Sequence, residues 1–336
     1  MSDLKHRLDE FLDKAGQRPE TQELTPDAST REYFRINWNG QSAIACVYPE
    51  SFIAEEQTYL DVSRLFTANN LPVAEIYSFD ERLGIIVQED LGDTILRDVL
   101  ANSDTAARET LIDESIGLIG RIQAATRSAF DTGSIASRLR FDTEKLLWEL
   151  SFFREHYFGT LRKIQLGQTE EGSLQNEFYS LAQMLEERAS VLCHRDFHAA
   201  NLMVDPSGKL RIIDHQDARI GSPTYDLVSL LLDRVVKPPE NDWLASKQRL
   251  LIDQRIDLGL EPLDYHEFAY EFRLQTVQRC LKAVGTFSFQ SVNRGKTYFL
   301  PFIKPMFEIV LRALSELERF PVLTSVVRKQ LESNDI

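Results

Sequence analysis

The chain has 336 residues, 43% of them hydrophobic, which is enough for a large core and long for a single lobe. A net charge of −14 argues against a general nucleic-acid binder, because such a protein needs a basic surface to displace counterions from phosphates. The three cysteines form no closely spaced pair, and no apolar run has the length of a signal peptide or a membrane span, so we expect a soluble cytoplasmic protein of two lobes.

The first 90 residues alternate between helical and β patterns. Apolar residues at helical spacing predict a short amphipathic helix over residues 4–15. The runs "REYFRINW" and "SAIACVY" flank Asn39-Gly40, the dipeptide that best supports a tight hairpin, and predict two paired strands. A helix over 52–68 and the strands "VAEIYSF" and "LGIIVQED" complete a small β-rich lobe, which ends near Asp90 at a hinge-like "DLGD".

Beyond this hinge the chain is mainly helical. Helices are predicted at 94–101, 104–128, 142–158, 174–189, from Thr224, around 263–284 and at 302–318. One β-hairpin, made by "NLMVD", the turn "PSGK" and "LRIIDH", interrupts them. The pattern predicts an α+β protein with an N-lobe over 1–90 and a C-lobe over 91–336.

A dense polar run, "VLCHRDFHAANLMVD", leads into that hairpin. It carries His194, Arg195, Asp196 and Asn201, and Asp214 follows the second strand. The spacing matches the H-R-D-x-x-x-x-N catalytic loop of kinases, with an aspartate in the place of the D-F-G acid.

Phosphoryl transfer explains why these residue types are needed. A carboxylate at Asp196 suits the task of orienting a nucleophilic hydroxyl and taking its proton. Mg²⁺ prefers oxygen ligands and keeps several waters, so the amide of Asn201 and the carboxylate of Asp214 suffice beside ATP phosphates. Because a two-stranded hairpin joins them, these two side chains are expected at the same end of it.

Over nearly all its length the chain resembles the protein-kinase-like superfamily that includes aminoglycoside and choline phosphotransferases. The segments "DASTREYFRI", "EDLGD", "HRDFHAANLMV" and "DHQDARIGSPTYDLVSLLLD" are similar to bacterial sugar kinases of cell-wall recycling, which phosphorylate the anomeric hydroxyl of N-acetylmuramate and N-acetylglucosamine. The resemblance implies a bilobal protein-kinase-like fold, ATP and Mg²⁺ as cofactors, and a sugar as the small-molecule acceptor. We expect a monomer or weak dimer with no nucleic-acid or membrane partner.

The resemblance also implies roles for single residues. It makes Asp196 the catalytic base and Asn201 and Asp214 the magnesium ligands. His194 would support the loop, and Asp226 would hold it by hydrogen bonds; the alternative for Asp226 is an acid favoured by the dipole at a helix start.

For the nucleotide, "VQEDLG" would be the linker that pairs with adenine, with Gln88, Glu89 and Leu91 nearest. The strand "SAIACVY" lacks the lysine that grips ATP phosphates in most kinases, and no glycine-rich loop precedes it. Arg31 and Arg35 are the candidate replacements; the alternative is that they are surface residues of a twisted hairpin.

The acceptor site is expected in the helical lobe. Asp217 is close enough in the chain to reach a sugar hydroxyl. Gln275, Arg279 and Lys282 share one helical face that would suit a lactyl carboxylate, although a solvated polar face is the alternative. His215 stands where many relatives have an aromatic residue.

Three competing functions remain open at the level of sequence. A kinase of this kind could act on an aminoglycoside, choline or homoserine. A metal-dependent hydrolase could use His194, Asp196, His198 and Asp214 as ligands, but this leaves Asn201 and the β-rich lobe unexplained. A pseudokinase would fit the missing lysine but not the three oxygen donors.

Overall fold

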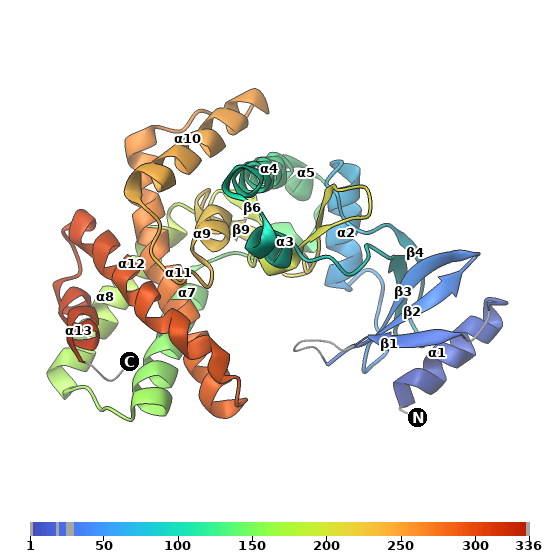
Figure 1. Cartoon of the computed structure of the whole chain (residues 1–336), viewed down its shortest axis with the longest axis horizontal. Coiled ribbons are helices and arrows are strands. Elements are labelled where there is room, and N and C mark those ends of the chain that lie inside the picture. Colours follow the sequence, from blue (N-terminus) through green and yellow to red (C-terminus); the bar gives the residue numbers. More distant parts are fainter. Residues whose placement is uncertain (1–2, 18–19, 25–29, 334–336) are drawn as a thin grey trace. The chain divides into compact units, whose positions relative to one another are not determined.

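The computed structural model describes residues 3–17, 20–24 and 30–333, which form two compact units. The first takes in the described residues of Met1–Arg108, Ser128–Ala136 and Ala199–Asp217; the second takes in those of Glu109–Arg127, Ser137–His198 and Ala218–Ile336. The first contains a five-stranded sheet and the second is mainly helical (Figure 1), so the predicted α+β class is confirmed. The predicted lobe boundary near residue 90 stays a prediction, because the two units interleave along the sequence.

The sheet of the first unit is antiparallel throughout, in the order β1-β2-β3-β5-β4. Its strands are β1 (Thr21–Leu24), β2 (Glu32–Trp38), β3 (Gln41–Val47), β4 (Ile76–Asp80) and β5 (Ile85–Glu89). The turn between β2 and β3 is the predicted one: Asn39 and Gly40 both have positive φ, 52° and 87°. Consecutive positive φ angles match the twist of a two-residue hairpin, which is why this dipeptide stands there.

Helices cover both faces of this sheet. Helix α1 (Asp3–Lys14) packs Leu8 and Phe11 against alternate residues of β2, β3 and β5. Helix α2 (Thr58–Ala68) packs on the opposite face, where Leu60 lies against Ile86. Strand residues point alternately to the two faces, so a sheet buried on both sides reads as the continuous apolar run seen in β3.

The second hairpin belongs to the first unit. Strands β7 (Leu202–Val204) and β8 (Leu210–Ile212) pair with each other. The Ile212 amide donates to the Pro72 carbonyl at 2.8 Å and the Val204 amide to the Thr94 carbonyl at 2.9 Å. These backbone bonds fix the hairpin to the segments on either side of β4 and β5.

The second unit is built around α11 (Tyr265–Asn293), the longest helix of the described chain. Around it lie α7 (Thr143–Phe153), a π-helical stretch (Arg154–Arg162), α8 (Gln168–Glu186), α9 (Tyr225–Leu232), α10 (Asn241–Asp257), α12 (Ile303–Leu317) and α13 (Pro321–Glu332). Tyr157 and Phe307 are fully buried, with ring centroids 4.8 Å apart. Strands β6 (Val191–Cys193) and β9 (Arg219–Gly221) form a short ladder. Along the chain, α3 (Leu96–Asn102), α4 (Thr105–Ala124), α5 (Thr126–Asp131) and α6 (Ile135–Arg138) connect the first sheet to α7.

Some elements lay outside the predicted set. Strands β1, β6 and β9 have only three or four residues, too few to show a period of two. Helix α10 has its apolar residues mainly in two short runs, "WLA" and "LLI", within a polar segment. Helix α13 begins at Pro321, which is tolerated at a first helical position. The helix predicted over 104–128 is divided into α4 and α5 near Ala125.

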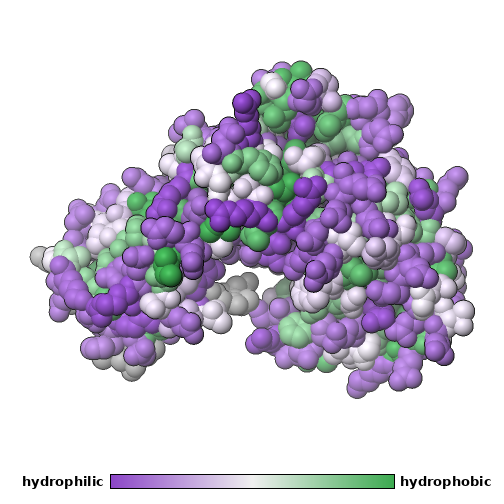
Figure 2. Space-filling model, turned by 180° about the vertical axis from the view of Figure 1, so that it is seen from behind, coloured by the Kyte–Doolittle hydropathy of each residue, from purple (hydrophilic) through white to green (hydrophobic). Residues whose placement is uncertain are grey.

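The molecular face in Figure 2 is mainly hydrophilic, with small hydrophobic groups scattered over it. Scattered groups of this kind are normal for a folded protein and mark no docking surface. Among the described residues, no helix combines the length and the apolar character needed to cross a bilayer.

Helix α11 approaches α7 closely at Gly285, where an added Cβ would stand 2.7 Å from the Phe153 Cα atom. Gly285→Ala should therefore lower the free energy of unfolding by about 1–3 kcal/mol, because the two backbones must separate. Urea unfolding checks this. The control is Gly172→Ala in α8, where nothing lies within 4 Å of the new Cβ, so stability should rise by about 0.5–1 kcal/mol. Equal effects of the two changes would contradict the close-contact explanation.

Candidate functional site

The polar run begins with β6 and continues into a loop from His194, and Asp226 in the first turn of α9 holds the backbone of this loop. The buried carboxylate of Asp226 accepts hydrogen bonds from the His194 amide at 2.7 Å and the Arg195 amide at 3.1 Å. Arg195 has a φ of 87°, a costly conformation for a residue with a side chain. Burial raises the pKa of Asp226 to about 6, against the lowering effect of His194 and of the two amide donors. His194 itself is fully buried and lies edge-on to the Phe197 ring, at 5.6 Å.

Asp196 is surrounded by positive charge. Its Oδ1 lies 3.3 Å from Arg279 Nη2 and 3.6 Å from Lys282 Nζ, and its Oδ2 lies 3.7 Å from Arg195 Nε. Burial alone would raise the pKa of this carboxyl, but the charges of Lys282, Arg279 and Arg195 outweigh it and hold the pKa well below its usual range. Asp196 is therefore ionised, and 29% of its side chain is exposed.

Of the three polar residues predicted on one face of α11, Gln275 and Arg279 are buried and Lys282 is mostly buried. Gln275 is 1% exposed and Arg279 8%, and 14% of the Lys282 side chain is exposed. The alternative of a solvated face is therefore wrong. Arg279 also donates through Nε to the Ser229 hydroxyl at 2.8 Å, so α9 and α11 together fix its guanidinium beside Asp196.

Asn201 and Asp214 meet at one end of the β7–β8 hairpin, in the first unit. The Asn201 amide nitrogen lies 3.4 Å from Asp214 Oδ2, and the Ile213 backbone amide donates to the Asn201 carbonyl at 3.2 Å. Asp214 is exposed, has a φ of 60° and accepts a bond from Gln216 Nε2 at 2.8 Å. One amide and one exposed carboxylate at the end of a paired hairpin match what Mg²⁺ takes from a protein when phosphates and waters supply its other ligands.

His215, next to Asp214, is fully buried and packs as an aromatic residue would. Its ring stacks on Tyr59 at 4.9 Å and on Phe66 at 5.3 Å, both in α2. Its Nε2 is also 2.7 Å from the Ser63 hydroxyl. Histidine at position 215 therefore stacks on its neighbours as an aromatic residue would, and it also makes a hydrogen bond to Ser63 of α2.

The predicted adenine linker is anchored by its side chains. Gln88 accepts a bond from the Tyr59 hydroxyl at 2.6 Å, and Leu91 is 5% exposed. The Glu89 carboxylate accepts hydrogen bonds from both terminal nitrogens of Arg211, a residue of β8. The sequence patterns did not single out Arg211, although the alternation in "LRIID" places it on the polar side of β8.

The two candidate phosphate-binding arginines have different surroundings. Arg35 pairs with Asp90 and Asp93, each at 2.7 Å. The Arg31 guanidinium lies over the Tyr33 and Tyr48 rings, at 5.6 and 5.5 Å.

Asp217, predicted to reach the acceptor from three residues beyond Asp214, is partly buried. Among the described residues, no group of three His, Cys, Asp or Glu side chains could hold a metal ion. The hydrolase alternative therefore lacks its metal cluster in this part of the chain.

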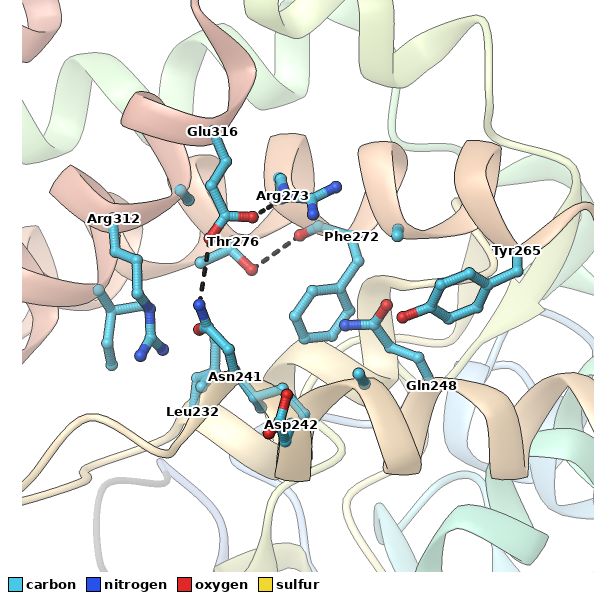
Figure 3. Close-up of a pocket in the computed structure, with 15 residues that line it drawn as sticks. Leu232, Asn241, Asp242, Gln248, Tyr265, Phe272, Arg273, Thr276, Arg312 and Glu316 are labelled. Atoms are coloured by element: carbon cyan, nitrogen blue, oxygen red, sulfur yellow. Dashed lines mark hydrogen bonds and ion pairs between the residues drawn. The ribbon is translucent and has the colours of Figure 1, made fainter.

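A pocket of about 220 Å³ in the second unit is lined by α9, α10, α11 and α12 (Figure 3), but by none of the predicted site residues. Two of its lining charges pair with each other: Arg273 lies 2.5 Å from Glu316, and the Asn241 amide also donates to Glu316. The pocket is a gap between packed helices, separate from the constellation around Asp196.

Asp226→Asn should lower the free energy of unfolding by about 1–3 kcal/mol, because an amide offers one oxygen acceptor where two buried backbone donors need two. Urea unfolding measures the change. Asp264→Asn is the matched control: Asp264 also accepts from two backbone amides, those of His266 and Glu267, but at a helix N-cap, where asparagine serves equally well. Equal losses in the two variants would contradict the role of Asp226 in the loop.

Comparison with known proteins identifies the family. Residues 20–263, well over half of the chain, match the model of the phosphotransferase enzyme family. An N-acetylmuramate/N-acetylglucosamine kinase of Neisseria meningitidis serogroup B is 31% identical over 290 residues, 86% of this chain and 84% of the relative. A kinase of the same name from Pseudomonas putida is 27% identical over 293 residues, 84% of this chain and 80% of the relative.

Solved structures share the fold. The choline kinase LicA from Streptococcus pneumoniae has a TM-score of 0.56 at 16% identity, with 94% of this chain and 100% of that chain covered. The gentamicin-APH(2")-IIa complex has a TM-score of 0.60 at 14% identity, with 96% of this chain and 99% of that chain covered. These likenesses confirm the predicted kinase-like fold. Together with the family match over most of the sequence, they show that this chain belongs to the phosphotransferase enzyme family.

Proposed function

We propose that this protein is an ATP-dependent sugar kinase that phosphorylates the anomeric hydroxyl of N-acetylmuramate or N-acetylglucosamine. Relatives with that name align over 86% and 84% of the chain. The observation that carries the choice of acceptor is the cluster of three cations within 3.7 Å of Asp196. A neutral sugar, or one with a carboxylate, is compatible with these charges, whereas a cationic aminoglycoside or choline is repelled.

In the proposed reaction, Asp196 orients the acceptor hydroxyl and takes its proton. The hydroxyl oxygen forms a bond to the γ-phosphorus as the bond to the β–γ bridging oxygen breaks, and ADP leaves. An ionised Asp196 is ready to accept the hydroxyl's hydrogen bond. A carboxylate of such low basicity acts mainly by orientation, with proton transfer late in the step.

Asn201 and Asp214 are the proposed magnesium ligands, and the bound ion would neutralise charge on the nucleotide phosphates. Their fixed separation at the hairpin end supports this role. The hairpin is joined to the proposed adenine linker by the Arg211–Glu89 pair. Gln88, Glu89 and Leu91 would then present the linker backbone to adenine from an anchored strand.

Arg31 is the better candidate for the cation that replaces the missing lysine. Arg35 is neutralised by Asp90 and Asp93, whereas Arg31 lies against two aromatic rings. One of these rings belongs to Tyr33, which lies opposite Cys46 in the β2–β3 register. Strand β3 is the one that carries the lysine in most kinases. A cation at the phosphates in place of that lysine also removes the main argument for a pseudokinase.

Asp217, Arg279 and Lys282 are proposed to contact the acceptor, with the two cations suited to a lactyl carboxylate. A cytoplasmic location and a monomer or weak dimer complete the proposal. The three cysteines, all within the described residues, are buried free thiols, which fits a reducing compartment.

The purified protein with Mg-ATP should phosphorylate N-acetylmuramate or N-acetylglucosamine at C1, giving an acid-labile phosphate detectable by mass spectrometry. A panel of amino alcohols and aminoglycosides run in parallel should show little turnover. Asp196→Asn should lower kcat by roughly 10²–10⁴-fold while ATP binding persists, because the base acts on the hydroxyl. Turnover confined to a cationic acceptor would overturn the choice of sugar, and full activity of the variant would overturn the choice of base.

Asp214→Asn should weaken the magnesium-dependent part of ATP binding by at least roughly tenfold, because it removes the only carboxylate of the proposed pair. Calorimetric titrations with ATP, with and without Mg²⁺, measure this part directly. Asp205→Asn is the control, since Asp205 lies at the opposite end of the same hairpin, where it accepts bonds from the turn residues Ser207 and Lys209. Equal magnesium dependence in the two variants would contradict the assignment.

A further inference from the structure

A chain of buried polar groups joins α7 to α11 within the second unit. Gln275 Nε2 donates to Gln278 Oε1 at 2.9 Å, and Gln278 Nε2 donates to Glu149 Oε2 at 2.7 Å. All three residues are at most 1% exposed. A carboxylate this deep needs compensation for its lost hydration, and one amide donor is insufficient compensation for a full charge.

Lys282 supplies the opposite charge, and its ammonium group lies between the carboxylates of Glu149 and Asp196. Its Nζ lies 3.5 Å from Glu149 Oε1 and 3.6 Å from Asp196 Oδ1. The ammonium thus lies between two carboxylates and in tight contact with neither, since a charge-assisted bond is about 2.7–2.9 Å long. Burial lowers the pKa of Lys282, and the charge of Glu149 opposes that effect.

Helix packing fixes this spacing. Lys282 and Gly285 are three residues apart on α11, and Glu149 and Phe153 are four apart on α7, so each pair shares a helix face. Gly285 lets the α11 backbone approach Phe153 more closely than a Cβ would allow. The same contact brings Lys282 to the level of Glu149.

We propose that Glu149 is a positioning residue for phosphoryl transfer: together with Gln278 it holds the Lys282 ammonium back from Asp196, so that the Asp196 carboxylate keeps an acceptor oxygen for the substrate hydroxyl. The inference rests on the proposed role of Asp196 as the base. Without Glu149 the ammonium has a single carboxylate partner nearby and closes on Asp196. The resulting tight ion pair competes with the substrate hydroxyl for the same oxygen.

Glu149→Gln tests this directly, because the amide oxygen still accepts the Gln278 bond while the charge is removed. We expect kcat to fall roughly tenfold, with the KM values for ATP and acceptor changed less than about threefold. In a Lys282→Met background the same change should have no further effect on kcat, since Glu149 acts through Lys282. Glu149→Asp, which keeps the charge, should recover part of the loss.

Two further variants keep the result interpretable. Tyr157→Phe removes a buried hydrogen bond to Gln330 elsewhere in the unit, so it should lower stability and leave kcat unchanged. Gln278→Met removes the donor to Glu149 without changing charge; should Glu149→Gln not fold, this variant should lower kcat about threefold, again only while Lys282 is present.

The outcomes separate this inference from the proposal on which it rests. Multiplicative losses in the Glu149→Gln/Lys282→Met double variant, or full activity of Glu149→Gln, would overturn the positioning role. Asp196→Asn is measured in parallel on the best acceptor of the panel. If that variant stays fully active, the choice of base fails; if it is inactive while the double variant shows multiplicative losses, only the role of Glu149 fails.

Discussion

One electrostatic requirement links the helices near Asp196: a partly buried carboxylate must be compensated by charges held in place. Asp196 meets this requirement with Arg279 and Lys282 from α11 and Arg195 from its own loop. Two of these cations have partners on other helices: Arg279 donates a hydrogen bond to Ser229 of α9, and Lys282 lies near the Glu149 carboxylate of α7. The packing of three helices is thereby linked to the ionisation of one side chain. This explains why long polar residues lie inside a helical core, where apolar residues would pack more cheaply.

The proposed functional groups are divided between the two units along the chain. The polar run leaves the second unit after His198 and enters the first at Ala199, so Asp196 belongs to one unit and Asn201 and Asp214 to the other. Within the first unit, the β7–β8 hairpin is fixed to the sheet by backbone bonds and by the Arg211–Glu89 pair. The proposed metal ligands and the proposed adenine linker therefore belong to the first unit, while the proposed base belongs to the second.

Local sequence patterns sufficed to predict structure where the interacting residues are close together in the chain. The catalytic-loop spacing, the hairpin after it and the Asn39-Gly40 turn were all readable, because their partners are close in sequence. The acid in "TYDL" was readable through the family resemblance, and its two bonds to the loop backbone have the geometry of a holding role. The proposed role of Glu149 could not be predicted from the sequence, because Glu149 precedes Lys282 by more than 130 residues and stands in an ordinary amphipathic helix. Its role depends on a helix crossing at Gly285, and no local pattern encodes which helix crosses there.

Net charge proved a poor guide to the charge at the proposed site. The whole chain carries −14, which on its own could suit a cationic acceptor such as an aminoglycoside. Around Asp196, however, the nearest charged groups are cations. The neighbouring acid on α7, Glu149, accepts a hydrogen bond from Gln278 and lies 3.5 Å from Lys282. Surface acids are screened by solvent and salt, whereas buried charges a few ångströms from a ligand are screened much less. The few cations at the proposed base therefore weigh more in the proposed acceptor choice than the many acids of the chain, and they favour a neutral or anionic sugar over a cationic acceptor.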